Sequence, residues 1–174
     1  MAGWGTAVVD GPRIELYDGP RRDLRALFEL AEDSPAQLDA YLALGRVLVA
    51  RFGAQIVGHL QVVATGRPCE AEIKNMAVLT PYQGRRIGRA LVDSLIEMLA
   101  DEKVTTLLVA TAAADLDNLR FYQRRGFRMR SVERDAFTEA TGYPPGLLID
   151  GIALRDRVWL DLTVPTSHPA PSSS

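Results

Sequence analysis

One segment of the chain, residues 72–91, constrains the fold more than any other. It reads EIKNMAVLTPYQGRRIGRAL. We interpret it as a strand over residues 71–79, a turn, and a basic, glycine-containing loop that leads into an amphipathic helix. A proline cannot continue a central strand, so the strand should end before Pro81. Residues of one buried helix face recur at i, i+3, i+4 and i+7, in Ile87, Ala90, Leu91, Ser94, Leu95, Met98 and Leu99.

The start of this helix is predicted to bind phosphate. Unpaired backbone N–H groups and the positive end of the helix dipole meet there. Three arginines, Arg85, Arg86 and Arg89, lie at the same place. Each cation at a helix N-terminus is unfavourable by some tenths of a kcal/mol, so three of them indicate an anion that compensates their charge. The alternative is that these arginines are simply solvated.

Two common phosphate-binding loops do not fit. A Walker A loop needs a lysine followed by serine or threonine, whereas Arg89-Ala90 follow the second glycine here. A dinucleotide fingerprint needs three glycines at a fixed spacing, which residues 83–88 lack. The loop therefore belongs to another type.

Residues 83–88, QGRRIG, resemble the pyrophosphate loop of the GNAT superfamily of acyl-CoA-dependent N-acyltransferases. That loop has the form Q/R-x-x-G-x-G/A. Gln83, Ile87 and Gly88 match it, whereas Arg86 stands where the first glycine usually falls. We therefore expect the loop to present the Arg86 amide without the positive φ that a glycine adopts readily.

A second element, DNLRFYQRRGF at residues 117–127, resembles the aromatic-pair and Gly-Phe motif of the same superfamily. Asn118, Tyr122 and Arg125 lie at i, i+4 and i+7, on one face of a short helix. Phe121 should point towards a core, and Gly126 is suited to end the helix. Two motifs in the superfamily's order support the resemblance, which covers residues 14–164.

The rest of the chain fits one α/β domain at residues 1–164. Strands are predicted at residues 13–17, 46–52, 55–64, 105–110, 127–136 and 152–164, and two helices within residues 21–44, broken at Ser34-Pro35. The resemblance implies a GNAT-type mixed, mostly antiparallel central sheet of about seven strands flanked by about four helices. Residues 165–174 are rich in proline and serine, which predicts a disordered tail.

The composition limits the partners. A net charge of −2 provides no basic field for nucleic acid. No apolar run reaches the roughly 18 residues of a membrane span, and no signal pattern begins the chain. A single cysteine, Cys69, indicates a reducing compartment, and His59 and His168 lack metal-ligand spacing. We therefore expect a cytoplasmic protein without a metal, membrane or nucleic-acid partner.

The resemblance implies acetyl-CoA as the acyl donor, attacked by an amine. Glu72 is the candidate base, since some members place a catalytic glutamate on this strand. Strand alternation puts Glu72, Lys74, Met76 and Val78 on one face unless a bulge intervenes. The alternative, a rim carboxylate that pairs with Lys74 or only orders water, carries equal weight.

The resemblance also makes Tyr122 the candidate donor to the departing thiolate, because the family commonly uses this tyrosine of the downstream motif, and its phenol matches a thiolate reasonably in acidity. A core aromatic is the alternative. Val78 is expected to offer its N–H to the oxyanion, on a strand that in this family splays from its neighbour. Asn118 would bind the pantetheine arm or cap its helix. The expected coenzyme-binding residues are Met76, Ala77, Val78, Gln83, Gly84, Arg85, Arg86, Ile87, Gly88, Arg89 and Asn118.

Two functions follow from these features. The first is an acetyl-CoA-dependent N-acetyltransferase that acts on a primary amine of a small molecule or a protein. The second is a non-catalytic acyl-CoA-binding sensor or interaction module. The acceptor is not identified, although Glu32, Asp33 and Asp39 could attract a cationic amine. The apolar loop at residues 137–149 could cover an active site or bury the contact of a homodimer.

Overall fold

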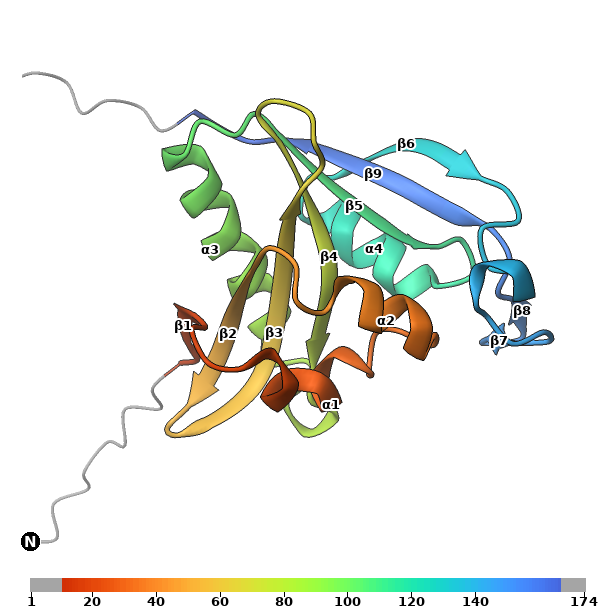
Figure 1. Cartoon of the computed structure of the whole chain (residues 1–174). Coiled ribbons are helices and arrows are strands. Elements are labelled where there is room, and N and C mark those ends of the chain that lie inside the picture. The colour runs from red at the N-terminus through yellow and green to blue at the C-terminus, as the bar shows by residue number, and fades with distance from the viewer. Residues whose placement is uncertain (1–10, 167–174) are drawn as a thin grey trace, which may run out of the picture.

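The centre of the molecule is a mixed seven-stranded sheet in the order β1-β2-β3-β4-β5-β9-β6 (Figure 1). A computed structural model describes residues 11–166. The strands are β1 (Arg13–Leu16), β2 (Arg46–Phe52), β3 (Gln55–Ala64), β4 (Glu70–Val78), β5 (Thr106–Ala112), β6 (Arg128–Glu133) and β9 (Arg157–Thr163). Neighbours are antiparallel except β4 and β5, which are parallel. The predicted mixed, mostly antiparallel sheet is confirmed.

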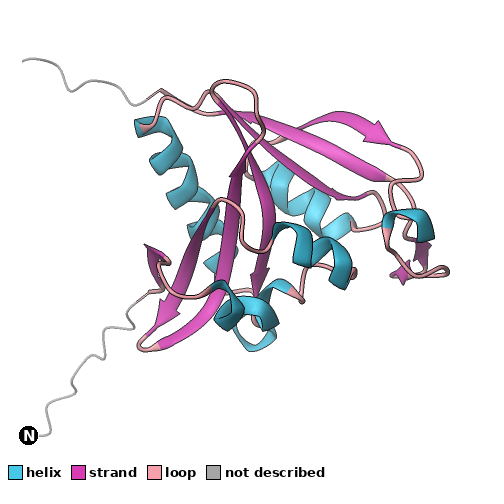
Figure 2. Ribbon diagram, viewed as in Figure 1, coloured by secondary structure: helices cyan, strands magenta, loops and turns pink. Residues whose placement is uncertain are grey.

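Helices cover both faces of the sheet (Figure 2). They are η1 (Arg21–Leu24), α1 (Arg25–Phe28), α2 (Pro35–Tyr41), η2 (Thr80–Tyr82), α3 (Ile87–Asp101), α4 (Leu116–Arg124) and η3 (Glu139–Thr141). The first helices pack on β2 through one apolar cluster, and α3 and α4 share a larger cluster with most of the strands. Ser34 caps α2 by accepting from the N–H of Gln37 at 3.3 Å, as its position before Pro35 predicted.

The two helices that carry the sequence motifs begin and end as their residues dictate. Helix α3 starts at Ile87 and buries four members of the predicted stripe, Ile87, Leu91, Leu95 and Leu99, together with Val92, whereas Ala90, Ser94 and Met98 are half-buried. Helix α4 ends at a left-handed Gly126, with φ 92°. The N–H of Gly126 donates to Gln123 and that of Phe127 to Tyr122, at 3.0 and 3.1 Å. This is a Schellman closure, which satisfies the last carbonyl groups of the helix.

Strands β4 and β5 pair over only part of their length. The ladder runs from Glu70 opposite Thr106 to Ile73 opposite Val109, and then the two strands diverge (Figure 1). Strand β4 continues to Val78 without β5 beside it. The splay that the family resemblance implied is therefore present, and it opens the sheet into a V.

A β-bulge re-aims the side chains of β4. Gln61 of β3 lies opposite Asn75 and Val62 opposite Ile73, so Lys74 has no partner in the register. Lys74 extends over the Tyr41 ring of α2, whereas Met76 and Val78 pack with the cluster of α3. The bulge therefore breaks the alternation predicted for Glu72 to Val78, because one extra residue reverses the facing of every later side chain.

The C-terminal part departs from the prediction in detail. Strands β6 and β9 are shorter than predicted, and the loop between them folds a small hairpin, β7 (Leu148–Ile149) and β8 (Ile152–Ala153). Apart from Pro165 and Thr166, the predicted tail at residues 165–174 lies outside the described residues.

Candidate active site

An inner cavity of about 200 Å³ opens where β4 and β5 separate. Glu72 of β4 and Tyr122 of α4, both predicted as catalytic, line this cavity together. Its wall also holds Lys74 and Asn118, and aromatic residues from distant segments close it. The fold thus brings the predicted base and the predicted proton donor to one small space.

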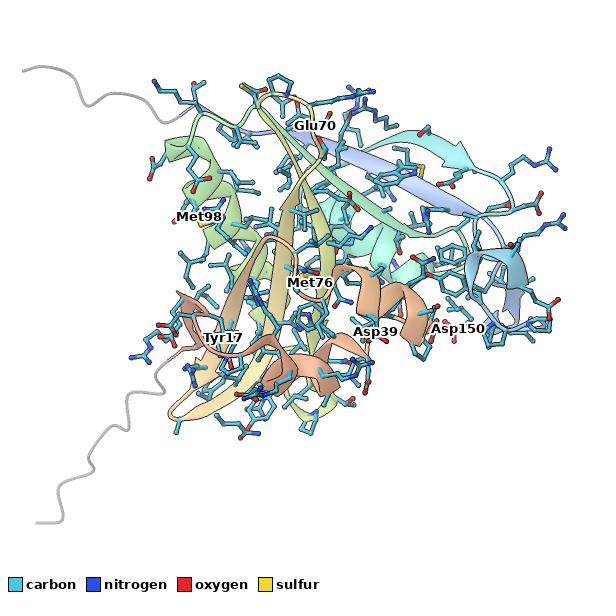
Figure 3. The ribbon with its side chains drawn as sticks, viewed as in Figure 1. Tyr17, Asp39, Glu70, Met76, Met98 and Asp150 are labelled. Atoms are coloured by element: carbon cyan, nitrogen blue, oxygen red, sulfur yellow. The ribbon has the colours of Figure 1, made fainter. Side chains whose placement is uncertain are left out.

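An outer groove of about 890 Å³ runs from the V to the start of α3. Met76, Asp115 and Asn118 belong to the walls of both spaces, so the groove adjoins the inner cavity. Met76 is labelled in Figure 3, near the middle of the sheet. The groove is lined by the predicted coenzyme-binding residues Met76, Ala77, Val78, Gln83, Gly84, Arg86, Ile87, Gly88, Arg89 and Asn118.

The arginines of the loop differ in where they point. Arg85 does not line the groove, since its guanidinium lies over the Tyr82 ring, 5.4 Å from the centroid. Arg89 pairs with Asp93 at 3.2 Å. Arg86 lines the groove and forms no ion pair with any residue in the described range. Arg124, near the C-terminal end of α4, also lines the groove.

The backbone at the start of α3 is arranged for an anion. Arg86 is the N-cap and adopts the left-handed conformation, with φ 62° and ψ 14°. The expectation that this residue would lack positive φ is therefore wrong. A left-handed backbone costs a non-glycine residue roughly 1–2 kcal/mol, which the surrounding turn must offset. The N–H groups of Ile87, Gly88 and Arg89 find no acceptor within residues 11–166, as expected for a first helical turn.

The backbone of β4 also offers free groups along the V. The N–H of Leu79 donates to Val57 at 2.8 Å, so Leu79 and, two residues earlier, Ala77 direct their backbone groups to β3. Those of Met76 and Val78 point the other way, into the V. The Gln83 side chain already donates to the Val78 carbonyl at 3.1 Å. An extended ligand can therefore pair with Met76 and Val78, but not with the backbone of Ala77.

Tyr122 is more buried than its neighbour. Its ring packs edge-on against Phe121 and Phe127 and is only 4% exposed, whereas Phe121 is half-buried. Burial, assisted by the Asp115 carboxylate, raises the pKa of Tyr122. The match in acidity with a thiol therefore does not hold for the buried hydroxyl, which keeps its proton. That hydroxyl has no hydrogen-bond partner among the described residues, so its hydrogen is available to a ligand.

Asn118 is held by the cap of α4. Asp115 is the N-cap, and its carboxylate accepts from the Asn118 N–H at 2.9 Å and from the Asn118 side-chain amide at 2.7 Å. Asn118 is therefore not the cap itself, as the sequence allowed. One of its two amide hydrogens is used in this way, so its carbonyl oxygen can accept from a ligand and its second amide hydrogen can donate to one, between the groove and the inner cavity.

Glu72 lies inside the cavity rather than on the rim. Its side chain is only 15% exposed and pairs with Lys74 at 3.4 Å. The pairing with Lys74 that the alternative expected is therefore present, whereas the carboxylate lies in the cavity wall; the role of Glu72 as the base stays a prediction.

A chain of hydrogen bonds connects β4 to α1, α2 and the loop between them, and so holds one wall of the cavity in place. The Asn75 amide donates to the Phe28 carbonyl and the Tyr41 hydroxyl, at 3.2 and 2.8 Å. Its oxygen must therefore accept from His59, which lies 2.8 Å away and stacks on Phe28. Tyr41 donates to Glu32 in turn, at 3.2 Å. Asparagine, tyrosine and glutamate thus connect the bulged strand to the loop before α2.

The loop between β6 and β9 forms the roof of the cavity. Tyr143 donates to Glu32 at 2.9 Å, and Gln37 donates to the Thr141 carbonyl, also at 2.9 Å. Phe137, Tyr143, Ile149 and Leu154 of this loop line the cavity. Of the two roles predicted for the apolar loop, covering an active site is the one that its contacts support.

The buried His59 predicts a loss of stability in mild acid. Burial lowers the pKa of His59 to about 4, whereas an unfolded histidine titrates near 6.5. The unfolded state therefore binds more protons between these values, and the free energy of unfolding falls as the pH drops through that window. We expect a loss of about 2 kcal/mol from this group between pH 7 and pH 5.

Denaturant unfolding at both pH values checks this prediction, with His59→Gln as the comparison. Glutamine retains a donor for Asn75 and does not titrate, so the variant should lose less stability on acidification. An equal loss in both proteins would contradict the assignment.

The described residues contain no group of three or more His, Cys, Asp or Glu side chains that could hold a metal ion. His168 lies outside them. None of the helices in residues 11–166 combines the length and apolar character needed to cross a membrane. Cys69 is exposed, with no disulfide.

Comparison with known proteins identifies the family of this architecture. A family model described as "Acetyltransferase (GNAT) family" matches residues 14–127. An uncharacterised N-acetyltransferase of Bacillus subtilis, YvbK, is 32% identical over 152 residues, which cover 86% of this chain and 96% of that protein.

Two solved structures extend the comparison to bound coenzyme. A Bacillus subtilis acetyltransferase in complex with CoA has 31% identity and a TM-score of 0.80, covering 88% of this chain and 99% of the other. A GNAT family acetyltransferase from Elizabethkingia anophelis with acetyl-CoA bound has 25% identity and a TM-score of 0.79, with the same coverage of 88% and 99%.

Proposed function

The chain belongs to the GNAT family of acetyltransferases and is an N-acetyltransferase, and we propose that it transfers the acetyl group of acetyl-CoA directly to a primary amine bound in the inner cavity. One observation carries the proposal. Glu72 and Tyr122 line the same cavity, and this cavity shares Met76 and Asn118 with the groove that leads to the start of α3. A donor in the groove and an acceptor in the cavity would meet between a base and a proton donor.

The groove offers a place for each part of the coenzyme. The diphosphate would accept from the free N–H groups of Ile87, Gly88 and Arg89, with the Arg86 side chain beside them. The pantetheine amides would pair with the backbone of Met76 along the V, where β5 has withdrawn, which leaves the Val78 N–H for the oxyanion. This route would carry the thioester towards the inner cavity, past Asn118.

The reaction then needs one proton removed and one supplied. The acceptor nitrogen attacks the thioester carbonyl carbon and passes a proton to Glu72, while the Val78 N–H donates to the oxyanion. When the C–S bond breaks, the Tyr122 hydroxyl donates its hydrogen bond and then its proton to the sulfur. The phenolate regains a proton as free CoA leaves. Because its pKa is raised, the Tyr122 hydroxyl stays protonated and first stabilises the developing thiolate as a hydrogen-bond donor; the same shift makes the phenol the weaker acid, so the proton transfer that follows is uphill.

Thiol release with a panel of primary amines tests the proposal. Purified protein, acetyl-CoA and each amine are mixed, free CoA is followed with a thiol reagent, and the acetylated amine is identified by mass spectrometry. The panel should contain small cationic amines, lysine peptides and peptides with free N-termini. Coenzyme binding without thiol release for any amine would support the non-catalytic sensor instead.

Arg86 is expected to contribute strongly to coenzyme affinity. Hydrogen bonds to charged groups are worth about 1.5–3 kcal/mol, so Arg86→Glu should raise the Kd for CoA by at least about tenfold at low salt. The effect should shrink as salt screens the charge. Calorimetric titration at two salt concentrations measures it.

Arg85→Glu is the matched control. The adjacent guanidinium lies over Tyr82 and outside the groove, so the same charge reversal should weaken binding much less. A second variant, Arg86→Gly, separates the effect of the side-chain charge from the effect of the backbone conformation. It should also lose affinity, yet its free energy of unfolding should not fall, because glycine adopts positive φ without strain. Equal losses of affinity at Arg85 and Arg86 would contradict the assignment.

A further inference from the structure

The amine nearest to the candidate base belongs to the protein itself. The Nζ atom of Lys74 lies 3.4 Å from the Glu72 carboxylate and 5.3 Å from the centroid of the Tyr41 ring. All three residues line the inner cavity, and so does Tyr122. Lys74 therefore lies where the acceptor amine of the proposed reaction would have to be placed.

The bulge of β4 is the reason for this position. Lys74 is the extra residue, without a partner in the register with β3, and it lies on the same face as Glu72. The Lys74 side chain is 35% exposed, so it is neither locked in the core nor free in solvent. A flexible four-carbon stem can carry the amine towards the V without moving the strand.

The only other lysine provides an internal reference. The chain contains two lysines, Lys74 and Lys103. Lys103 is exposed beyond the C-terminal end of α3 and lines neither the cavity nor the groove. A reaction that requires the cavity residues should therefore modify Lys74 and leave Lys103 unmodified.

We propose that Lys74 is a self-acetylation site, modified by acetyl-CoA when no external acceptor occupies the cavity. This inference rests on the proposed function. Nζ first loses its ammonium proton to solvent; the neutral amine then attacks the thioester carbonyl carbon, and the proton it sheds as the C–N bond forms passes to Glu72. The C–S bond breaks, and the CoA sulfur takes a proton from Tyr122. The products are Nε-acetyl-lysine and free CoA, so no further reagent is needed.

The modification would change the cavity in two ways. Acetylation removes the positive charge of Lys74, which ends its ion pair with Glu72 and leaves the acidic lining of Glu32, Asp33 and Asp115 less balanced. It also adds an acetyl group to a space of about 200 Å³. The modified enzyme should therefore turn over external amines more slowly. Self-acetylation would in this way inhibit the enzyme when acetyl-CoA is present and acceptor is scarce.

The test uses the full chain and acetyl-CoA with a deuterated acetyl group, without acceptor. Peptide mapping by mass spectrometry follows both lysines, and acetylation also blocks tryptic cleavage after Lys74. We expect label on Lys74 and not on Lys103, at a first-order rate that does not change with protein concentration. Glu72→Gln and Tyr122→Phe should slow labelling at least tenfold. Lys74→Arg should remove the label and still bind CoA, and Lys103→Arg should behave like the unchanged protein.

Other results would overturn the inference. Similar label on both lysines, or labelling that survives in Glu72→Gln and Tyr122→Phe, would mean uncatalysed chemistry. A rate proportional to protein concentration would mean transfer between molecules. An unlabelled Lys74 in a preparation that acetylates an external amine would end the inference and leave the proposed function intact. An unlabelled Lys74 together with no thiol release from any amine would end both.

Discussion

Replacement of Tyr122 by phenylalanine is expected to lower kcat by about 10²- to 10⁴-fold, the range typical of a lost general acid, with little change in the Kd for CoA. The hydroxyl lines the inner cavity, whereas the groups that would hold the diphosphate lie in the outer groove. Because the proton is needed only as the C–S bond breaks, its loss affects the transition state and not coenzyme binding. Steady-state kinetics and calorimetric titration measure the two effects separately.

Stability should not explain the loss of activity. The Tyr122 hydroxyl has no hydrogen-bond partner within residues 11–166, and the ring contacts with Phe121 and Phe127 survive in phenylalanine. The free energy of unfolding should therefore stay the same or rise. Tyr17→Phe is the control, because that hydroxyl meets the Pro20 carbonyl and lines neither space. A normal kcat in Tyr122→Phe would remove this residue from the mechanism.

Replacement of Glu72 by glutamine is expected to lower kcat by about 100-fold near neutral pH. Glutamine has the same shape but cannot take a proton from the attacking amine. The defect should diminish as the pH rises, because a lysine-like amine, with a reference pKa of about 10.4, then loses its proton to solvent. The pH dependence of kcat for both proteins, with one amine that the enzyme accepts, measures this.

Glu70→Gln is the matched control for Glu72→Gln. Glu70 lies on the same strand, where it accepts from Thr65 and faces Arg130, and it lines neither the cavity nor the groove. Figure 3 labels it at the other end of β4 from Met76. A defect of equal size at every pH would mean that Glu72 positions the acceptor or orders water without acting as the base.

Local patterns in the sequence were sufficient for the elements that hold the site. The hairpin of β2 and β3 occupies the predicted residues 46–52 and 55–64, and α3 begins at Ile87. Gly126 ends α4 as expected. Each of these features depends on side-chain periodicity, turn residues or caps, which act over a few neighbouring residues. The two motifs that resemble elements of the family, at residues 83–88 and 117–127, are likewise short stretches of neighbouring residues.

The chemistry inside the cavity depended on contacts that no local pattern specifies. The bulge at Lys74 exists only in the register of β4 against β3, and it decides that Glu72 and Lys74 face away from Met76 and Val78. A pattern of alternation cannot reveal it, because the extra residue is defined by the partner strand. The same bulge placed the protein's own amine beside the candidate base.

The sequence by itself determined the family, the elements and the corner where α3 begins, because each is encoded in adjacent residues. Only the tertiary structure decided which atoms face the acceptor. Glu32 and Tyr143 join across 111 residues to hold the roof, and Arg86 takes a left-handed backbone that its residue type disfavours. Such features arise when packing between distant segments outweighs local preference, so they follow from the assembled fold.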